Sequence, residues 1–367
     1  MSAAGRRSED ASGPAAVAAA IREAGFVRLA ATADGDALAA TGLLVRALEA
    51  TETPYQAAVD AVPEPPATDA DRTVAVGHAP AGADVALSAP PLAPAAAEAA
   101  RELAADAVDP ILALAGARAA GAEPSGRPLE AADLERRPGV ALPTDDRADL
   151  SASTLVHAEF SGDREAAAAA LEGLDGDGDG GGREVASLVA LAAVEPDDAV
   201  PRAAETVRET LRPYGCDRFE TLGGYADVLG AVAADRPGVG LALALGRDVE
   251  PTALETWREH GRRAHAALRA ADTGRYDGFY VARVDDDDAP LGTVARLCLG
   301  YRSPEPVALV AADGRAAVAA ETAVAAPFET AAAALDGRAV VREGRGAATF
   351  DGTAADYLDA YREATRR

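Results

Sequence analysis

The first third of the chain alternates short apolar runs with longer segments whose apolar residues recur at helical spacing. Runs rich in Val, Ala and Leu predict strands at 26–33, 55–61, 73–78 and 84–87. Between and after these runs, the spacing predicts helices at 37–50, 93–106 and 109–121. Strands that alternate with helices of this length are typical of βαβ units, so we expect a mostly parallel sheet in this part of the chain.

The remainder of the chain changes from a helical to a mixed pattern. After an irregular segment at 124–150, helices are predicted at 163–173, 184–194, 199–212 and 223–234. Sheet-like runs follow at 278–285, 291–300, 306–312 and 315–321, before a closing helix at 353–365. We therefore expect an α/β protein with an N-terminal parallel-sheet domain, a helical connector and a smaller C-terminal α+β domain. The expected limits are 1–19 for a flexible tail, 20–160 for the first domain, 161–250 for the connector and 251–367 for the last domain.

The charge of the chain is extreme, at −25, from 60 acidic and 35 basic residues, and no residue is lysine. Carboxylate excess, missing lysine and abundant alanine together resemble proteins of salt-accumulating halophiles, because molar salt screens the repulsion between like charges. The acidity therefore indicates habitat and does not exclude nucleic acid as a partner.

Cysteine and hydropathy patterns exclude several classes of protein. Cys216 and Cys298 form no CxxC pair, which excludes a thiolate zinc finger and gives no support for a disulfide framework. No signal peptide and no apolar span of membrane length occurs, so we expect a soluble, cytoplasmic protein that does not contact a membrane. HExxH, GxSxG, Walker A and strand-placed GxGxxG patterns are also missing from the sequence.

Two carboxylates follow the first predicted strand directly. The strand ends near Ala31, and Asp34 and Asp36 stand between it and the helix that begins near Leu38. Ligands and metals bind at such strand ends in open α/β sheets, and two aspartates one residue apart suit a divalent cation that also holds phosphate oxygens. The alternative is an ordinary acidic loop in a chain rich in aspartate.

Two further motifs are weaker. Asp175, Asp177 and Asp179 imitate the start of an EF-hand loop, but the twelfth position, which should be a glutamate, is Ala186, so a solvated acidic turn is expected. His260 and His265 lie five residues apart on a predicted helix, a spacing that does not suit a zinc pair, and we expect them on the helix surface or in a cleft.

The same helix carries the most basic part of the chain. Its aromatic and guanidinium side chains suit a phosphate or single-strand groove; the alternative is that the arginines only pair with nearby carboxylates. These residues are Trp257, Arg258, Arg262, Arg263 and Arg269.

Several segments, in order, resemble the DHH phosphoesterase superfamily, and specifically archaeal RecJ-like proteins. Residues 32–37 are similar to the HxDxDG loop of that family, with Thr32 in place of its histidine. Residues 73–87 resemble the strand that normally ends in a metal-ligand aspartate; Gly77 stands there, with His78 next to it. Residues 98–124, 153–174 and 219–246 resemble the helices and connector, and 291–350 resemble the DHHA1 domain without its GGGH element. No His-His pair occurs.

The resemblance implies a DHH-like domain, a connector and a DHHA1-like domain, and a manganese-dependent exonuclease in active members. It places Asp34 and Asp36, with His78 and Asp84 as weaker candidates, at the metal position, where they could hold one hydrated Mg²⁺ or Mn²⁺ but no metal pair. The leading hypothesis is a RecJ relative with reduced or no nuclease activity. It would bind single-stranded nucleic acid or serve as a replisome scaffold, with GINS and the MCM helicase as partners by resemblance.

In that hypothesis Trp257, Arg258, Arg262, Arg263 and Arg345 are the candidate nucleic-acid contacts. One alternative is an active single-strand exonuclease or phosphodiesterase that uses Asp34 and Asp36. Another is a structural protein that binds neither metal nor nucleic acid.

Overall fold

The computed structural model describes residues 12–63, 70–174, 179–196 and 199–366 of the chain. Internal contacts divide the chain into two compact units. The first unit comprises Met1–Leu134 and Tyr225–Thr256, and the second comprises Glu135–Gly224 and Trp257–Arg367. The limits expected for the tail, the domains and the connector stay a prediction. No helix in the described ranges is both long enough and apolar enough to cross a membrane.

The first unit is built on a parallel sheet in the order β2-β1-β3-β4. Its strands are β1 (Val27–Thr32), β2 (Tyr55–Asp60), β3 (Arg72–Val76) and β4 (Val85–Leu87). Each lies within two residues of its predicted bounds. Val, Ala and Leu dominate β1, β3 and β4, as expected for parallel strands that are mostly buried, whereas alternate residues of β2 are exposed. The expected parallel-sheet domain is confirmed.

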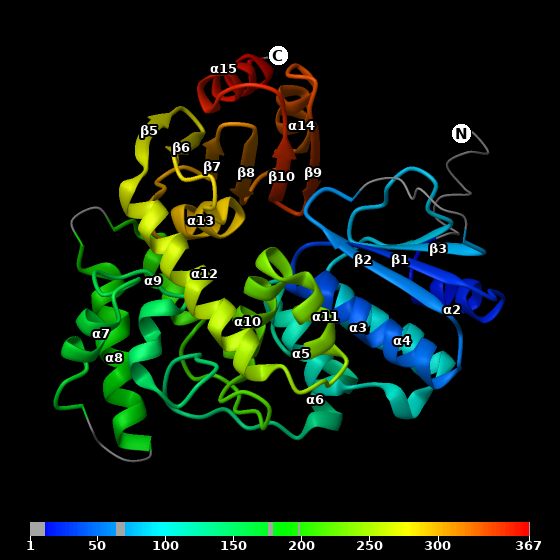
Figure 1. Ribbon diagram of the computed structural model, residues 1–367. Coiled ribbons are helices and arrows are strands. Elements are labelled where there is room, and N and C mark those ends of the chain that lie inside the picture. Colours follow the sequence, from blue (N-terminus) through cyan, green and yellow to red (C-terminus); the bar gives the residue numbers. More distant parts are fainter. Residues whose placement is uncertain (1–11, 64–69, 175–178, 197–198, 367) are drawn as a thin grey trace. The chain divides into compact units, whose positions relative to one another are not determined.

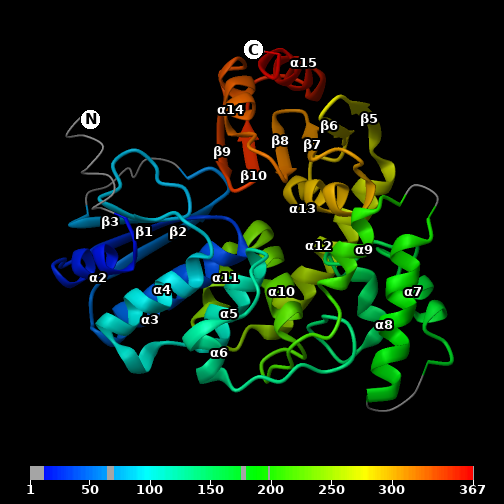
Figure 2. The same ribbon diagram turned by 180° about the vertical axis from the view of Figure 1, so that it is seen from behind.

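Helices α2 (Pro14–Arg22), α3 (Gly35–Ala50) and α4 (Leu92–Leu103) lie on one face of this sheet (Figures 1 and 2). The unit also contains α5 (Pro110–Ala119), α6 (Gly126–Ala132), most of α10 (Leu222–Asp235), α11 (Pro237–Ala244) and the start of α12 (Glu250–Ala270). Helix α2 begins inside the segment expected to be a tail, because Val17 and Ile21, one helical turn apart, are both buried.

The abundant small residues let these helices approach closely. A Cβ atom on Gly116 of α5 would lie 2.4 Å from Cβ of Ala93 and 2.7 Å from Cβ of Ala39. A Cβ atom on Gly42 of α3 would lie 2.4 Å from Cβ of Ala244 in α11. The glycines therefore set the spacing of α3, α4, α5 and α11, and larger residues there would force the helices apart.

The second unit combines a helical part with a six-stranded mixed sheet. The helical part contains the short helix η2 (Arg147–Ala152), α7 (Arg164–Ala170), α8 (Asp179–Val194), α9 (Arg202–Arg208) and the rest of α12. The strands are β5 (Asp272–Tyr276), β6 (Phe279–Arg283), β7 (Val307–Ala312), β8 (Arg315–Ala320), β9 (Arg338–Arg342) and β10 (Arg345–Thr349). They lie in the order β5-β6-β7-β8-β10-β9, and of these described strands only β6 and β7 are parallel neighbours.

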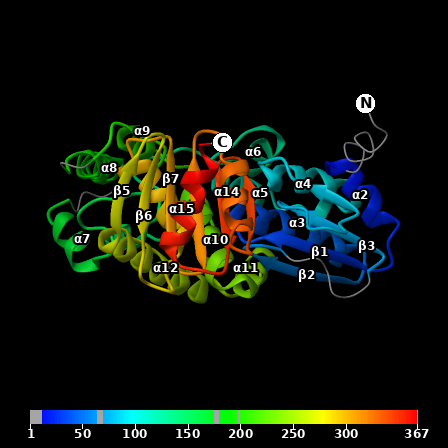
Figure 3. The same ribbon diagram turned by 90° about the horizontal axis from the view of Figure 1, so that it is seen from above.

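Both faces of this sheet are covered. Val307, Leu309 and Ala311 of β7 belong to the core that also contains Phe328 of α14 (Ala325–Ala333) and Tyr357 of α15 (Ala354–Ala364). These two helices are seen over the strands in Figure 3. The alternate residues of β7 point to the other face, on which α13 (Leu291–Leu297) packs. The expected C-terminal α+β domain is confirmed.

Three predictions for this unit fail at particular places. Residues 291–300 were expected to be a strand but form α13 and the π-helical turn η3 (Cys298–Arg302), because Pro290 and the buried residues Val294, Ala295 and Leu297 favour a helix. Strand β5 was missed because it is an exposed edge strand without an apolar alternation. Strands β9 and β10 were missed because their apolar runs are only two or three residues long, with arginine at both ends of β9 and at the start of β10. Most of the acidic turn predicted from Asp175 onward lies outside the described residues.

Candidate functional site

The carboxyl ends of β1, β2 and β3 are joined by hydrogen bonds that involve the residues predicted to bind a metal. The backbone N–H of Ala33 donates to the carbonyl of Asp60 at 2.9 Å, which ties β1 to β2. The backbone N–H of His78 donates to Oγ1 of Thr32 at 2.9 Å, which ties the loop after β3 to β1. Asp34, Asp60 and His78 therefore follow neighbouring strand ends, as a ligand site in an open α/β sheet requires.

Asp34 follows β1 at the carboxyl ends of the strands, where helix α3 begins. It is the N-cap residue, with an extended backbone, and its Oδ1 accepts a hydrogen bond from the backbone N–H of Ala37 at 2.9 Å. A capping carboxylate of this kind satisfies one of the N–H groups that the first helical turn leaves unpaired.

Asp36 accepts hydrogen bonds from the start of a second helix, α4. Its Oδ2 accepts from the backbone N–H of Leu92 at 2.8 Å and its Oδ1 accepts from that of Ala93 at 2.9 Å, at the start of α4. Pro91, the N-cap residue of α4, offers no side-chain cap. The Asp36 side chain is 1% exposed, so a charged group from α3 supplies the N-terminal cap of α4.

These contacts decide whether the residues fit a metal. Both oxygens of Asp36 accept backbone N–H groups inside the protein, and Asp34 caps its own helix. Within the described ranges, no three Asp, Glu, His or Cys side chains come together as a metal site. The residues present therefore do not fit the two-metal centre of a nuclease, which needs several carboxylates and imidazoles around the ions.

Two other aspartates complete the description of this sheet. Asp84 was expected as a further ligand, but its Oδ2 accepts from the backbone N–H of Thr73 at 2.7 Å, at the opposite end of β3 from His78. This expectation is wrong, because the loop between β3 and β4 returns to the start of the strand. Asp60 was missed, although an acidic residue at the end of a predicted parallel strand was a usable signal.

The predicted nucleic-acid residues of α12 divide between its two faces. Trp257 is fully buried, so no base can stack on it in this structure, and the expected stacking platform is corrected. Arg262 pairs with Glu259 at 2.8 Å, and Arg263 donates to the carbonyl of Asp288. Arg345 lies apart from them, at the exposed start of β10. The aromatic and the arginines do not form one surface, because the apolar face of the helix takes the tryptophan inward.

Arg258 is held by a buried carboxylate. Its Nε and Nη2 donate to the two oxygens of Asp149 at 3.0 and 2.8 Å, and Asp149 also accepts from Arg164 at 2.6 Å and from Thr144 at 2.7 Å. Burial acts to raise the pKa of Asp149, but the hydrogen bonds from Arg258 and Thr144 and the charges of the two arginines outweigh it and lower that pKa. This network joins η2, α7 and α12.

Both histidines of α12 are buried, which corrects the expectation that they lie on the surface or in a cleft. Nε2 of His260 lies 2.8 Å from Oγ1 of Thr293. Nε2 of His265 lies 3.0 Å from the carbonyl of Ser153, and its Nδ1 lies 3.1 Å from Nδ1 of His157. The side chain of Arg302 lies 3.1 Å from Nε2 of His157.

The hydrogen-bond roles in the His157–His265 pair follow from its two ends. A carbonyl only accepts and a guanidinium only donates, so His265 carries a proton on Nε2 and His157 accepts on Nε2. Nδ1–H of a neutral His157 then donates to Nδ1 of a neutral His265. Burial, and then the charges of His265, Arg302 and Arg269, lower the pKa of His157 to about 3, which agrees with a neutral pair.

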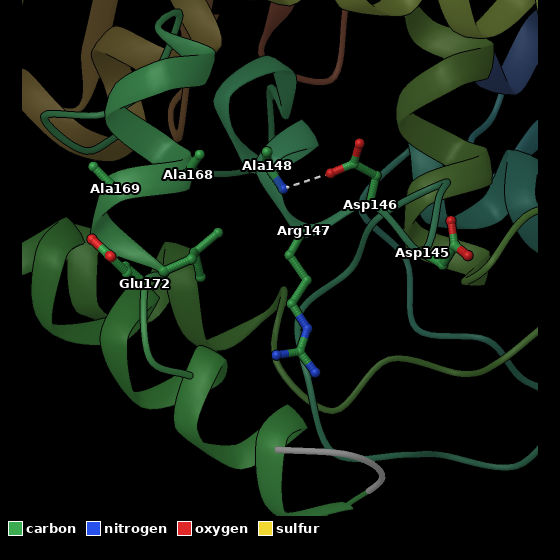
Figure 4. Close-up of a pocket in the computed structure, with 8 residues that line it drawn as sticks. Asp145, Asp146, Arg147, Ala148, Ala168, Ala169 and Glu172 are labelled. Carbon is green, nitrogen blue, oxygen red and sulfur yellow. Dashed lines mark hydrogen bonds between the residues drawn. The ribbon is translucent and has the colours of Figure 1, made fainter. Parts of the chain in front are cut away.

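A shallow hollow of about 650 Å³ lies beside α7 in the second unit (Figure 4). Its lining residues are Asp145, Asp146, Arg147, Ala148, Ala168, Ala169, Leu171 and Glu172. Asp146 caps the backbone N–H of Ala148 at 3.0 Å, and Arg147 donates to the carbonyl of Leu174 at 2.5 Å. Because alanines and an acidic rim line it, this hollow offers no convergent set of catalytic groups.

Comparison with known proteins identifies one relative by sequence and several solved structures with a similar chain path. Residues 271–363 match the family model described as the C-terminal domain of the uncharacterized protein rrnAC1427. The chain is 49% identical to the uncharacterized protein rrnAC1427 of Haloarcula marismortui over 376 residues, which cover 99% of this chain and 100% of that protein. The haloarchaeal source of that relative agrees with the salt-rich habitat that the composition of this chain predicts.

Among solved structures, CDC45 from Entamoeba histolytica matches with a TM-score of 0.56 at 9% identity, over 96% of this chain and 98% of CDC45. RecJ from Thermus thermophilus in complex with Mg²⁺ matches with a TM-score of 0.46 at 18% identity, over 96% of this chain and 52% of RecJ. The chain thus spans about half the length of that RecJ. The match to CDC45 shows that the two chains share a fold.

Proposed function

The chain belongs to the family of the uncharacterized protein rrnAC1427 of Haloarcula marismortui, and from this premise and its fold we propose that it is a RecJ-like protein of DNA replication or repair that binds nucleic acid or partner proteins without cutting nucleic acid. The observation that carries the proposal is the position of Asp36. A carboxylate that is 1% exposed and accepts two backbone N–H groups of α4 is a structural cap rather than an open metal ligand.

Under this proposal, the residues at the strand ends stabilise the fold but no longer form a catalytic metal centre. Asp34 and Asp36 hold the starts of two helices, and Thr32 binds the loop of His78. These contacts need the two aspartates and no metal. Nucleic-acid contact then depends on arginine side chains at the surface, among which Arg258, Arg262, Arg263 and Arg345 stay proposed contacts. GINS and the MCM helicase stay proposed partners by resemblance.

A nuclease assay tests this proposal. Wild-type protein in molar KCl with Mn²⁺ is incubated with single strands labelled at the 5′ or 3′ end, and the same preparation is assayed for strand binding. We expect no cleavage with either label. Asp34→Asn is the matched variant, because asparagine also caps a helix and leaves the fold intact while removing a metal-ligating charge.

Cleavage by wild type that is lost in Asp34→Asn would overturn the proposal and support the active exonuclease instead. Cleavage that persists in the variant is checked after a second purification on a different column. Activity that remains after this step would also overturn the proposal, and activity that disappears came from a contaminating nuclease.

A further inference from the structure

Strand β5 forms one end of the six-stranded sheet and pairs with β6 on its inner side (Figure 3). Four of its five residues are exposed, and the central residue, Gly274, is half-buried. In the described part of the chain, no other strand pairs with its outer side. An exposed edge of this kind is a surface on which a further strand can form backbone hydrogen bonds.

The backbone groups on the outer side of β5 belong to Thr273 and Arg275. The turn between β5 and β6 has two residues, 277–278, so Tyr276 and Phe279 form the hydrogen-bonded pair that closes the hairpin. Every second residue of an antiparallel strand directs its backbone groups to the same neighbour, so those of Thr273 and Arg275 point away from β6. Among the residues that the structure describes, no other backbone group pairs with them.

The outer edge of β5 is complementary to itself. When two copies of the strand lie antiparallel about a two-fold axis at Gly274, Thr273 of each copy lies opposite Arg275 of the other, and each such pair exchanges two backbone hydrogen bonds. Gly274 then meets its own copy in the close, non-hydrogen-bonded position, where it brings no side chain. A register with Arg275 opposite itself would bring like charges together. The backbone and the charges therefore favour the register centred on Gly274.

The side chains in this register also complement each other. Asp272 of one copy lies opposite Tyr276 of the other, on the same face of the sheet. Tyr276 is 38% exposed, its ring is stacked on that of Phe279 with centroids 5.0 Å apart, and the guanidinium carbon of Arg362 lies 4.8 Å from its ring centroid. The side chain of Asp272 is 68% exposed. A carboxylate of one copy thus faces a phenol and a guanidinium of the other, which is an attractive arrangement.

We propose that the outer edge of β5 is an interface between two copies of this chain, which joins their two six-stranded sheets into one continuous sheet. This inference does not depend on the proposed function, because β5 contains none of the residues assigned to it.

The charges on β5 do not prevent this pairing. Charged residues often protect a strand edge, but in the register centred on Gly274 neither Asp272 nor Arg275 lies opposite a like charge. Arg275 keeps its own ion pair with Glu305, at 2.5 Å from Nε to Oε1, so its charge is compensated within each copy. The net charge of −25 on each copy is screened over about 3 Å in molar salt.

Sedimentation velocity of the full chain in molar KCl, at concentrations up to about 100 µM, tests this interface. We expect wild type to form a dimer in equilibrium with monomer. Thr273→Pro removes the outward N–H and leaves the hydrogen bonds to β6 in place, so it should weaken self-association at least about tenfold. Thr273→Val is the matched control, because it keeps that N–H but, like proline, lacks the hydroxyl that is hydrogen-bonded to Tyr280. It should associate as wild type does.

A cysteine at the two-fold axis tests the register. Two Cα atoms about 4.5 Å apart in a non-hydrogen-bonded pair lie within the range of a disulfide, and a Cβ atom on Gly274 makes only an ordinary contact with Tyr276 at 3.7 Å. With oxidised glutathione, we expect Gly274→Cys to form a disulfide-linked dimer. Asp277→Cys, in the exposed turn of the same hairpin, should stay unlinked. Wild type, which keeps Cys216 and Cys298, gives the background.

Three results would overturn the proposal. The first is a wild type that is monomeric at every concentration. The second is a folded Thr273→Pro protein, with the circular dichroism of wild type, that associates as Thr273→Val does. The third is equal crosslinking, or none, in Gly274→Cys and Asp277→Cys, because the copies would then meet at another surface. If Thr273→Pro does not fold, the comparison of the two cysteine variants decides.

Discussion

Asp36 in the first unit and Asp149 in the second are each 1% exposed, and the structure stabilises their carboxylates in different ways. Asp36 of the first unit accepts two backbone N–H groups at the start of α4. Asp149 of the second unit accepts from the side chains of Arg258, Arg164 and Thr144. A helix N-terminus offers fixed partial charges, whereas arginines offer full charges at an entropic cost.

The difference shows what each carboxylate does for the protein. Asp36 stabilises the geometry of two neighbouring helices, and that contact needs no other side chain. Asp149 joins η2 and α7 to the distant helix α12, and its contacts depend on two arginines that are about half exposed, at 54% and 44%. Neither carboxylate is arranged as a metal ligand, and the two should respond differently to substitution of their partners.

Removing one arginine from Asp149 should have the largest effect. We expect Arg258→Met to lower the free energy of unfolding by about 3 kcal/mol, because it leaves a buried charge with weaker compensation. Chemical denaturation in molar KCl measures this loss. Arg262→Met on the same helix is the control, since its pair with Glu259 is more than half exposed on both sides and should be worth less than about 1 kcal/mol. Equal losses in the two variants would contradict the account of Asp149.

Asp36→Asn should have the next largest effect, a loss of about 2 to 3 kcal/mol, because one carboxylate oxygen that accepts a backbone N–H is replaced by an amide that cannot accept. Asp60→Asn, at an exposed position on the same sheet edge, should change stability by less than about 0.5 kcal/mol. The same denaturation measurement compares them. If Asp36→Asn is as stable as wild type, Asp36 is not a cap.

A pH dependence distinguishes the second unit from the first. His157 has a pKa of about 3 in the folded protein and an ordinary value near 6.5 when unfolded, so between these values the unfolded chain binds a proton that the folded chain does not. This contribution to stability is present above pH 6.5 and is lost as pH falls toward 3, by up to about 1.4 kcal/mol per pH unit. Denaturation at stepped pH measures the slope. His157→Gln should have a shallower slope, and an identical slope would contradict the neutral pair.

Substitution of Asp34 should have the smallest effect. Asp34→Ala removes one N-cap and should cost about 1 kcal/mol, while Asp34→Asn should cost only a few tenths because asparagine caps equally well. Thermal unfolding of the two variants side by side measures this difference. Equal losses in the two variants would show that the charge of Asp34, and not its hydrogen bond, matters, because both substitutions remove the charge and only alanine removes the acceptor.

The strands of the parallel sheet could be predicted from the sequence because Val, Ala and Leu recur in short runs that alternate with segments of helical period. The edge strand β5, with the sequence DTGRY, carries no such signal, because one side of an edge strand faces water and its polar residues are allowed there. Residues 291–300 were misread because Leu, Val and Ala suit a helix as well as a strand over so short a length.

The place of Asp34 and Asp36 in the fold could be predicted, but the contacts of their side chains could not. The position of Asp34 and Asp36 at a strand end follows from residues 26–38 alone. The use of Asp36 as a cap depends on Pro91, Leu92 and Ala93, which are distant in sequence and have no local pattern that links them to it. The pairing of His157 with His265 likewise depends on how α12 packs against residues 153–162.

Thermal unfolding of wild type and Asp34→Asn in molar KCl, with and without millimolar Mn²⁺, examines whether the strand-end carboxylates hold a metal. A ligand that binds only the folded state raises the unfolding temperature in proportion to its affinity. If Asp34 and Asp36 are caps, Mn²⁺ should shift both proteins equally and slightly, through nonspecific effects on an acidic surface. A large upward shift of wild type that is lost in Asp34→Asn would show a metal site at this edge and contradict the structural role assigned to the two aspartates.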